Sequence, residues 1–126
     1  MRIPRTLSAL LILISTSAYA AELCQSFHGR ALYYSADGQF RIWHIGTHHE
    51  FEPPEMDGPD PDYEPSWDRL MQILLAGSRD PDSHALFADF VVCPTEPFRK
   101  GAAQKAIIRH IRHPHVVPRD QDGEPR

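Results

Sequence analysis

The chain has 126 residues, of which 41% are hydrophobic and 24% charged, and its 13 basic and 17 acidic residues give a formal net charge of −4. A chain of this length forms one small core, which excludes a Rossmann enzyme, a TIM barrel and a protein kinase. The acidic balance does not suggest a general nucleic-acid binder, which needs a broad positive surface. We therefore expect one small domain without a strong nucleic-acid signature, whose partner is unknown.

The first 20 residues have the pattern of a secretory signal peptide. Arg2 and Arg5 form a positive segment, residues 7–14 are apolar, and Ala18-Tyr19-Ala20 fits the small-x-small cleavage rule. Cleavage is predicted after Ala20, which makes the mature chain periplasmic or secreted. No later apolar run reaches the length of about 18 residues that a membrane span needs, so we expect no span in the mature chain.

Cys24 and Cys93 are the only cysteines of the chain. An even number of cysteines in an oxidising compartment favours one disulfide. On the chain-entropy model, closing this loop of about 70 residues would stabilise the fold by about 4 kcal/mol. A reactive Cys93 and a metal site shared by both thiols are the alternatives.

The first elements after Cys24 are predicted to be two strands. Residues 29–35 are rich in strand formers, Ala36-Asp37-Gly38 has the composition of a hairpin turn, and residues 39–45 form the second strand. Alternation divides the second strand into two faces, one with Phe40, Ile42 and His44 and the other with Arg41, Trp43 and Ile45.

One helix is predicted in the middle of the chain. Five prolines between residues 52 and 65 exclude regular structure before it, Ser66 is expected to cap it, and Gly77 is expected to end it. One face carries apolar residues at helical spacing, namely Trp67, Leu70, Met71, Leu74 and Leu75. This face should cover a sheet.

The last third of the chain is predicted to form further strands. Residues 86–93 alternate as a strand, and residues 104–111 suit a strand slightly better than a helix. These elements indicate a small α+β or all-β barrel. We expect a leader over residues 1–20, a single globular domain over 21–113, and a flexible tail over 114–126.

Two segments resemble a known group. Arg41-Ile42-Trp43-His44-Ile45-Gly46-Thr47 and the later Asp89-Phe90-Val91-Val92-Cys93-Pro94 resemble a group of small exported bacterial proteins of uncharacterised function. The likeness covers residues 28–111. It implies a mainly β fold with one helix, a small OB-like barrel, with an α+β antiparallel sheet and a packed helix as the alternative. No catalytic residues follow from it, and the chain lacks the second cysteine expected after Cys93-Pro94.

Charge is unevenly distributed along the sequence. Residues 50–68 contain eight acidic residues and no Lys or Arg, whereas residues 99–112 contain five basic residues and no acidic one. The simplest interpretation is a solvated acidic loop and a cationic strand face.

Histidines are the main candidates for chemistry, because the chain has eight of them. The spacing of His44 and His48 is that of a zincin helix, but Ile45 replaces the required Glu, and in a strand the two lie about 13 Å apart. A transition-metal site is predicted as an alternative to ordinary surface histidines, with zinc or copper as the ion. Its candidate ligands are His48, His49, Glu50, His110 and His113.

Motifs of the common enzymes are missing from the sequence. There is no G-x-S-x-G elbow, Walker loop or C-x-x-C pair. We therefore expect a non-enzymatic binding or envelope-associated module without a cofactor and without catalytic residues. The alternatives are a histidine-based metal-binding protein, and a binder of oligosaccharides or oligonucleotides that stacks its ligand on Tyr33 and Trp43. A pH response of the histidines is a further possibility.

Overall fold

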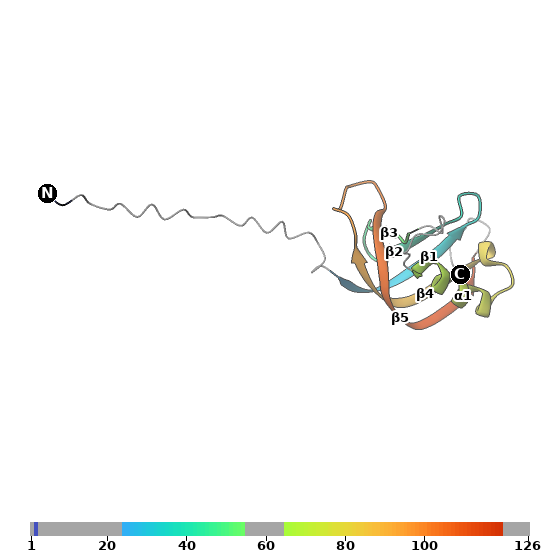
Figure 1. Cartoon of the computed structure of the whole chain (residues 1–126). Helices are drawn as coiled ribbons and strands as arrows, with labels where there is room; N and C mark the ends of the chain where they lie inside the picture. Colours follow the sequence, from blue (N-terminus) through green and yellow to red (C-terminus); the bar gives the residue numbers. More distant parts are fainter. Residues whose placement is uncertain (1, 3–23, 55–64, 120–126) are drawn as a thin grey trace.

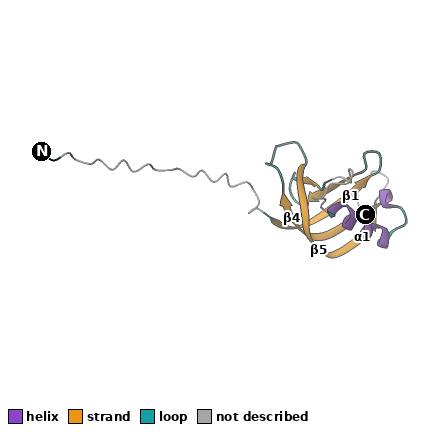
Figure 2. Ribbon diagram, in the orientation of Figure 1, coloured by secondary structure: helices purple, strands orange, loops and turns teal. Residues whose placement is uncertain are grey.

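Strands make up most of the described chain, and one α-helix packs beside them (Figures 1 and 2). The computed structural model describes residues 2, 24–54 and 65–119, so most of the predicted leader, the acidic residues 55–64 and residues 120–126 lie outside the described residues. The elements are β1 (Gln25–Tyr34), β2 (Gln39–His44), β3 (Glu50–Glu52), α1 (Ser66–Gly77), the 3-10 helix η2 (Pro81–Ser83), β4 (His84–Pro94) and β5 (Gln104–Pro118).

The five strands close into a barrel in the order β1-β2-β3-β5-β4, with β4 pairing back to β1. All pairs are antiparallel except β3 and β5, which run parallel through two residue pairs, Phe51 with Gln104 and Glu52 with Lys105. The predicted mainly β fold with one helix and a small OB-like barrel is therefore confirmed.

Alternating side chains fill the barrel. In β2, Phe40 and Ile42 are buried, as the predicted alternation requires, and the His44 ring stacks on Phe27 at a centroid distance of 4.4 Å. Each fully buried large side chain contributes about 1.5–3 kcal/mol to stability. The largest side chains of the core are Phe40, Phe51, Phe90, Ile42, Leu70, Leu74, Leu86, Ile108 and Val92.

Helix α1 packs against β5 and β4 with its predicted apolar face. Leu70 and Leu74 are completely buried and Trp67 is partly buried, and the Trp67 Nε1–H donates a 3.0 Å hydrogen bond to the carbonyl of Gly38. Leu75, at the edge of the stripe, is 50% exposed and does not join the core. None of the described helices has the length and apolar character that crossing a bilayer would demand.

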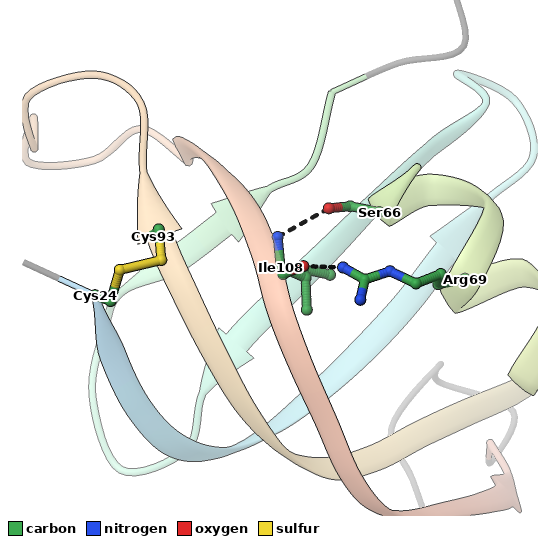
Figure 3. The surroundings of a disulfide bond; sticks show 5 residues. All are labelled: Cys24, Ser66, Arg69, Cys93 and Ile108. Carbon is green, nitrogen blue, oxygen red and sulfur yellow. Dashed lines mark hydrogen bonds between the residues drawn. A yellow bond between two sulfur atoms is a disulfide. The ribbon is translucent and has the colours of Figure 1, made fainter. Parts of the chain in front are cut away.

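Helix α1 is joined to the barrel through the backbone of Ile108 (Figure 3). Ser66, the first residue of α1, is fully buried, and its Oγ accepts a 2.8 Å hydrogen bond from the Ile108 N–H. One turn later the Arg69 guanidinium donates to the carbonyl oxygens of Ile108 and Arg109. The predicted capping role of Ser66 is wrong, because the N-cap position is taken by Pro65 and the Ser66 hydroxyl serves β5 instead.

Strand β5 is longer than expected. The strand interpretation of residues 104–111 is confirmed, but β5 continues to Pro118 and pairs with β4 as far as His84, so residues 114–118 are not a flexible tail. The physical reason is packing of Val116 against the core. A Cβ built on Gly77 would lie 2.5 Å from the Val116 Cβ, so a side chain at Gly77 would push β5 away.

Arg119 fastens the end of β5 to the barrel. Its backbone N–H donates to the Ser83 carbonyl at 2.8 Å, and its guanidinium donates to the carbonyls of His84 at 3.1 Å and Tyr33 at 3.0 Å. Burial lowers the pKa of the Arg119 guanidinium, but arginine remains charged at physiological pH. The three acceptors come from η2, β4 and β1, so one residue ties three segments together.

Cys24 and Cys93 form the predicted disulfide, with their Cα atoms 4.1 Å apart. Because Gln25 pairs with Val92, Cys24 lies opposite Cys93, and the bridge extends the ladder between β1 and β4 by one position. Figure 3 shows the bridge at the start of β1, away from α1. The disulfide therefore joins the start of β1 to the end of β4.

We expect Ser66→Ala to lower the free energy of unfolding by about 1–3 kcal/mol, because the buried Ile108 N–H loses its acceptor. Urea denaturation followed by tryptophan fluorescence measures this loss. The control is Ser35→Ala at an exposed hairpin position, for which a change below about 0.5 kcal/mol is expected. Equal stabilities of the two variants would contradict the proposed link between α1 and β5.

Removal of the disulfide in a Cys24→Ser, Cys93→Ser double variant should lower the free energy of unfolding by about 4 kcal/mol. The bridge spans a sequence separation of 69 residues, and its loss restores the loop entropy of the unfolded chain. Chemical denaturation of the two proteins under non-reducing conditions measures the difference. A loss below about 1 kcal/mol would mean that the β1–β4 ladder does not depend on the bridge.

Candidate functional site

His49, a member of the first predicted histidine cluster, makes contacts within the fold. The His49 ring stacks against Phe51 and Phe98, at centroid distances of 4.1 and 4.6 Å. The Gln104 amide nitrogen donates to the Glu96 carbonyl at 2.8 Å, so its amide oxygen faces His49 and accepts from the His49 Nε2 at 2.8 Å. The His49 Nε2 therefore carries a hydrogen. Through Gln104 and Phe98, the His49 ring stabilises the loop that follows β4.

The two predicted histidine clusters do not come together. Glu50 lies in β3 and His48 is exposed in the preceding turn. Strand β3 meets β5 at Gln104, whereas His110 and His113 lie farther along β5, about 20 Å or more from that point. Within residues 24–54 and 65–119, no three His, Cys, Asp or Glu side chains are placed to hold a metal ion. The structure therefore does not bring the candidate ligands of the two clusters together.

Tyr33 and Trp43, the two predicted stacking residues, lie on opposite faces of the sheet. Tyr33 packs against the core, with its ring 5.1 Å from that of Phe40. Trp43 is outside the core, where the Arg30 guanidinium lies 4.8 Å from its ring centroid and its Nε1–H donates to the Thr47 carbonyl at 2.7 Å. The two rings do not form a shared platform.

A different group of side chains meets on the outer surface of β1, β4 and β5. His28 lies opposite Asp89 in the β1–β4 ladder, and the two are joined by a 3.0 Å contact between His28 Nδ1 and Asp89 Oδ1. The second carboxylate oxygen, Oδ2, lies 3.0 Å from the Nδ1 of His113 in β5. We name this group, His28, Asp89 and His113, the histidine clasp.

A β-bulge brings His113 into the clasp. Phe87 pairs with His115 and Asp89 pairs with Arg112, so two residues of β5 lie opposite one residue of β4. His113 takes a positive φ of 53°, an uncommon value for a residue other than glycine. Such bulges redirect side chains beside functional sites. Here the bulge places Arg112 and His113 on the same exposed surface.

A shallow cleft of about 270 Å³ lies beside the clasp. It is lined by the exposed or partly exposed residues Ser26, His28, Asp89, Val91 and Arg112, and by Phe27 and Phe90, whose side chains are buried in the core. The Arg112 side chain is exposed and makes no ion pair or hydrogen bond with the described residues. Its guanidinium is therefore available to a ligand in the cleft.

The surface around the clasp is basic. Strands β1, β4 and β5 together contain one acidic residue, Asp89, and its carboxylate is already bonded to two imidazoles. We name the exposed surface of these three strands around Asp89 the basic wall. Its cations and histidines are Arg30, Arg109, Arg112, His28, His110, His113 and His115.

The hydrogen bonds from His28 and from His113 hold the pKa of Asp89 below its ordinary value of 3.8. Asp89 is therefore ionised at neutral pH and in mildly acidic solution. An ionised carboxylate accepts from both Nδ1–H groups, which orients the two rings and leaves each Nε2 pointing away from Asp89.

The arrangement does not form a nucleophile–base pair. Ser26 also lines the cleft, but among the described residues no hydrogen bond joins its hydroxyl to His28. Among the described residues, the cleft presents the Arg112 side chain and the ring of His28, which Asp89 orients.

Sequence analysis missed the clasp because its members lie far apart along the chain. His28 and Asp89 are separated by 61 residues, and only the register of β1 with β4 brings them together. The available signal was that Asp89 is the single acidic residue of three strands that contain five histidines. His113 is one of the predicted metal ligands, and its Nδ1 is bonded to Asp89.

We expect the carboxyl carbon of Asp89 to titrate below pH 3.8, and to return toward that value in His28→Ala and His113→Ala variants. NMR titration of the side chain measures this midpoint. Because the folded-state pKa is lowered, the stabilisation is present above pH 3.8 and is lost as the pH falls through the folded-state pKa. An Asp89 midpoint that does not change in either variant would contradict the clasp.

Comparison of the chain with protein-family models, with curated proteins and with solved structures finds no match. The basic wall, the clasp and the cleft lie on one outer surface of the barrel, which β1, β4 and β5 form.

Proposed function

We propose that this chain is an exported, non-enzymatic binding module that uses its basic wall to bind a linear polyanion, specifically an acidic polysaccharide. The observation that carries the proposal is the charge of the wall, where arginines and histidines surround a single carboxylate that is bonded to two imidazoles.

Two features support export. The first is the leader pattern over residues 1–20, with its predicted cleavage after Ala20. The second is the Cys24–Cys93 disulfide, since such bridges persist in the periplasm and outside the cell but are rare in the reducing cytosol.

The shape of the basic wall favours an extended ligand. Along β5 the exposed residues Arg109, His110, Arg112, His113 and His115 lie on one continuous stretch of the strand, in which two bulges interrupt the alternation of side chains. A polymer with charges repeated along its length can contact several of these groups at once. A single small anion would use only one part of the surface.

A polysaccharide suits the wall better than a nucleic acid. Single-stranded nucleic acids bind by stacking bases on exposed aromatic side chains. Tyr33 faces the core, and Trp43 lies near the Arg30 guanidinium, so neither offers an open ring on the basic wall.

We expect the purified mature protein to bind heparin and polygalacturonate at pH 6.0 and low salt. In an Arg109→Gln, Arg112→Gln double variant the affinity should fall about tenfold, since an exposed ion pair contributes up to about 1 kcal/mol. Its binding should also depend less steeply on salt, because fewer counterions are released. Isothermal titration calorimetry at several salt concentrations measures both effects.

Arg79→Gln is the matched control, because Arg79 is exposed but lies in the loop after α1, outside β1, β4 and β5. Its affinity should equal that of the unaltered protein. Absence of polysaccharide binding at pH 6.0 would overturn the proposal. Tighter binding to single-stranded DNA or to anionic phospholipid vesicles would also overturn it, because the ligand would belong to another class.

A further inference from the structure

The hydrogen bond to Asp89 makes the two ring nitrogens of His28 chemically different. Its Nδ1 faces Asp89 at 3.0 Å, and its side chain is 60% exposed, so Nε2 is the nitrogen that meets a ligand. In a neutral imidazole whose Nδ1–H donates to Asp89, Nε2 has a lone pair and repels an anion. After protonation Nε2 donates a hydrogen bond, and the ring attracts an anion.

Arg112 lies on the other side of the same cleft. The ladder places it opposite Asp89 in β5, whereas His28 lies opposite Asp89 in β1. Both residues line the cleft of about 270 Å³, together with the Ser26 hydroxyl. The cleft is small for a drug-sized ligand, and its size suits one sugar ring beside the partly exposed Val91.

We propose that this cleft is the specific subsite for one oxyanion group of the polysaccharide, a carboxylate or a sulfate, and that the group binds between the Arg112 guanidinium and a protonated His28. The inference rests on the proposed function and adds to it a defined subsite and a proton requirement. Binding is coupled to proton uptake, because the anion stabilises the imidazolium form of His28 and disfavours the neutral form.

Asp89 acts as a positioning residue in this subsite. Its two oxygens orient the rings of His28 and His113. The hydrogen bonds that lower the pKa of Asp89 keep it ionised over the pH range in which histidines gain protons, about pH 5 to 8. The carboxylate therefore supports the subsite throughout that range.

Other charged and titratable groups on the basic wall surround the subsite. Arg30 comes from β1, and the remaining groups come from β5, namely Arg109, His110, His113 and His115. All of them are cationic or become cationic on protonation. They strengthen polyanion binding in general as the pH falls, so a test of the subsite must separate His28 from a histidine that is not bonded to Asp89.

The experiment is calorimetric titration with heparin and polygalacturonate oligosaccharides between pH 5.5 and 8.0, in buffers with different ionisation enthalpies. We expect proton uptake on binding near pH 7 and an affinity at least about tenfold higher at pH 6.0 than at pH 8.0. His28→Gln should remove most of the proton uptake. His115→Gln, a control on the same wall but outside the clasp, should retain most of it.

Asp89→Asn separates positioning from simple repulsion. If Asp89 only repels the ligand, its neutralisation strengthens binding at every pH, and the subsite proposal fails. If Asp89 orients the His28 ring, the variant binds the oligosaccharides more weakly than the unaltered protein at pH 5.5.

The outcomes distinguish the two proposals. Polysaccharide binding that is independent of pH, or that loses equal proton uptake in His28→Gln and His115→Gln, overturns the subsite but leaves the binding function in place. Absence of binding at every pH overturns both. Circular dichroism of each variant checks that the barrel is folded, which is expected because His28, Asp89 and His115 are exposed.

Discussion

The contact between α1 and Ile108 is the constraint on which the barrel depends. Strands β3 and β5 pair through only two residue pairs, so beyond Lys105 the outer edge of β5 has no neighbouring strand among the described residues. Ser66 and Arg69 satisfy the N–H and carbonyl of Ile108 from one helical turn. The helix thus takes the place of a strand at that edge, and buried backbone groups need such partners.

The basic wall follows from how β5 is held. With one edge supported by α1 and the other paired to β4, β5 continues to Pro118 and presents its second half on the barrel surface. The bulge opposite Ala88 and the proline at position 114 interrupt the regular backbone of β5, which reduces the tendency of this strand to pair with another chain. The same bulge turns His113 toward Asp89. The bulge in β5 therefore both limits pairing with another chain and places His113 beside Asp89.

Local patterns in the sequence predicted the elements but not their tertiary partners. Alternation identified the core face of β2, and helical spacing identified Leu70 and Leu74, because burial selects residues with those periods. The role of Ser66 was mispredicted because a serine at the start of a helix usually accepts a hydrogen bond from a backbone N–H of the same helix. Here the Ser66 hydroxyl accepts from the N–H of Ile108 in β5, 42 residues away. The same limit applies to His28 and Asp89, whose pairing depends on strand register.

Net charge is a poor guide to the partner of this chain. The chain is acidic as a whole, with a formal charge of −4, yet its described residues 24–54 and 65–119 contain ten Lys or Arg and eight Asp or Glu. All eight histidines belong to these residues. Most of the surplus of acids lies in residues 55–64 and 120–126, so the excess of negative charge does not belong to the barrel. Because Debye screening limits electrostatic reach to about 8 Å in physiological salt, a ligand at the wall responds to Arg112 and the neighbouring histidines more than to the charge of the chain. The basic wall and an acidic composition are therefore compatible in one small protein.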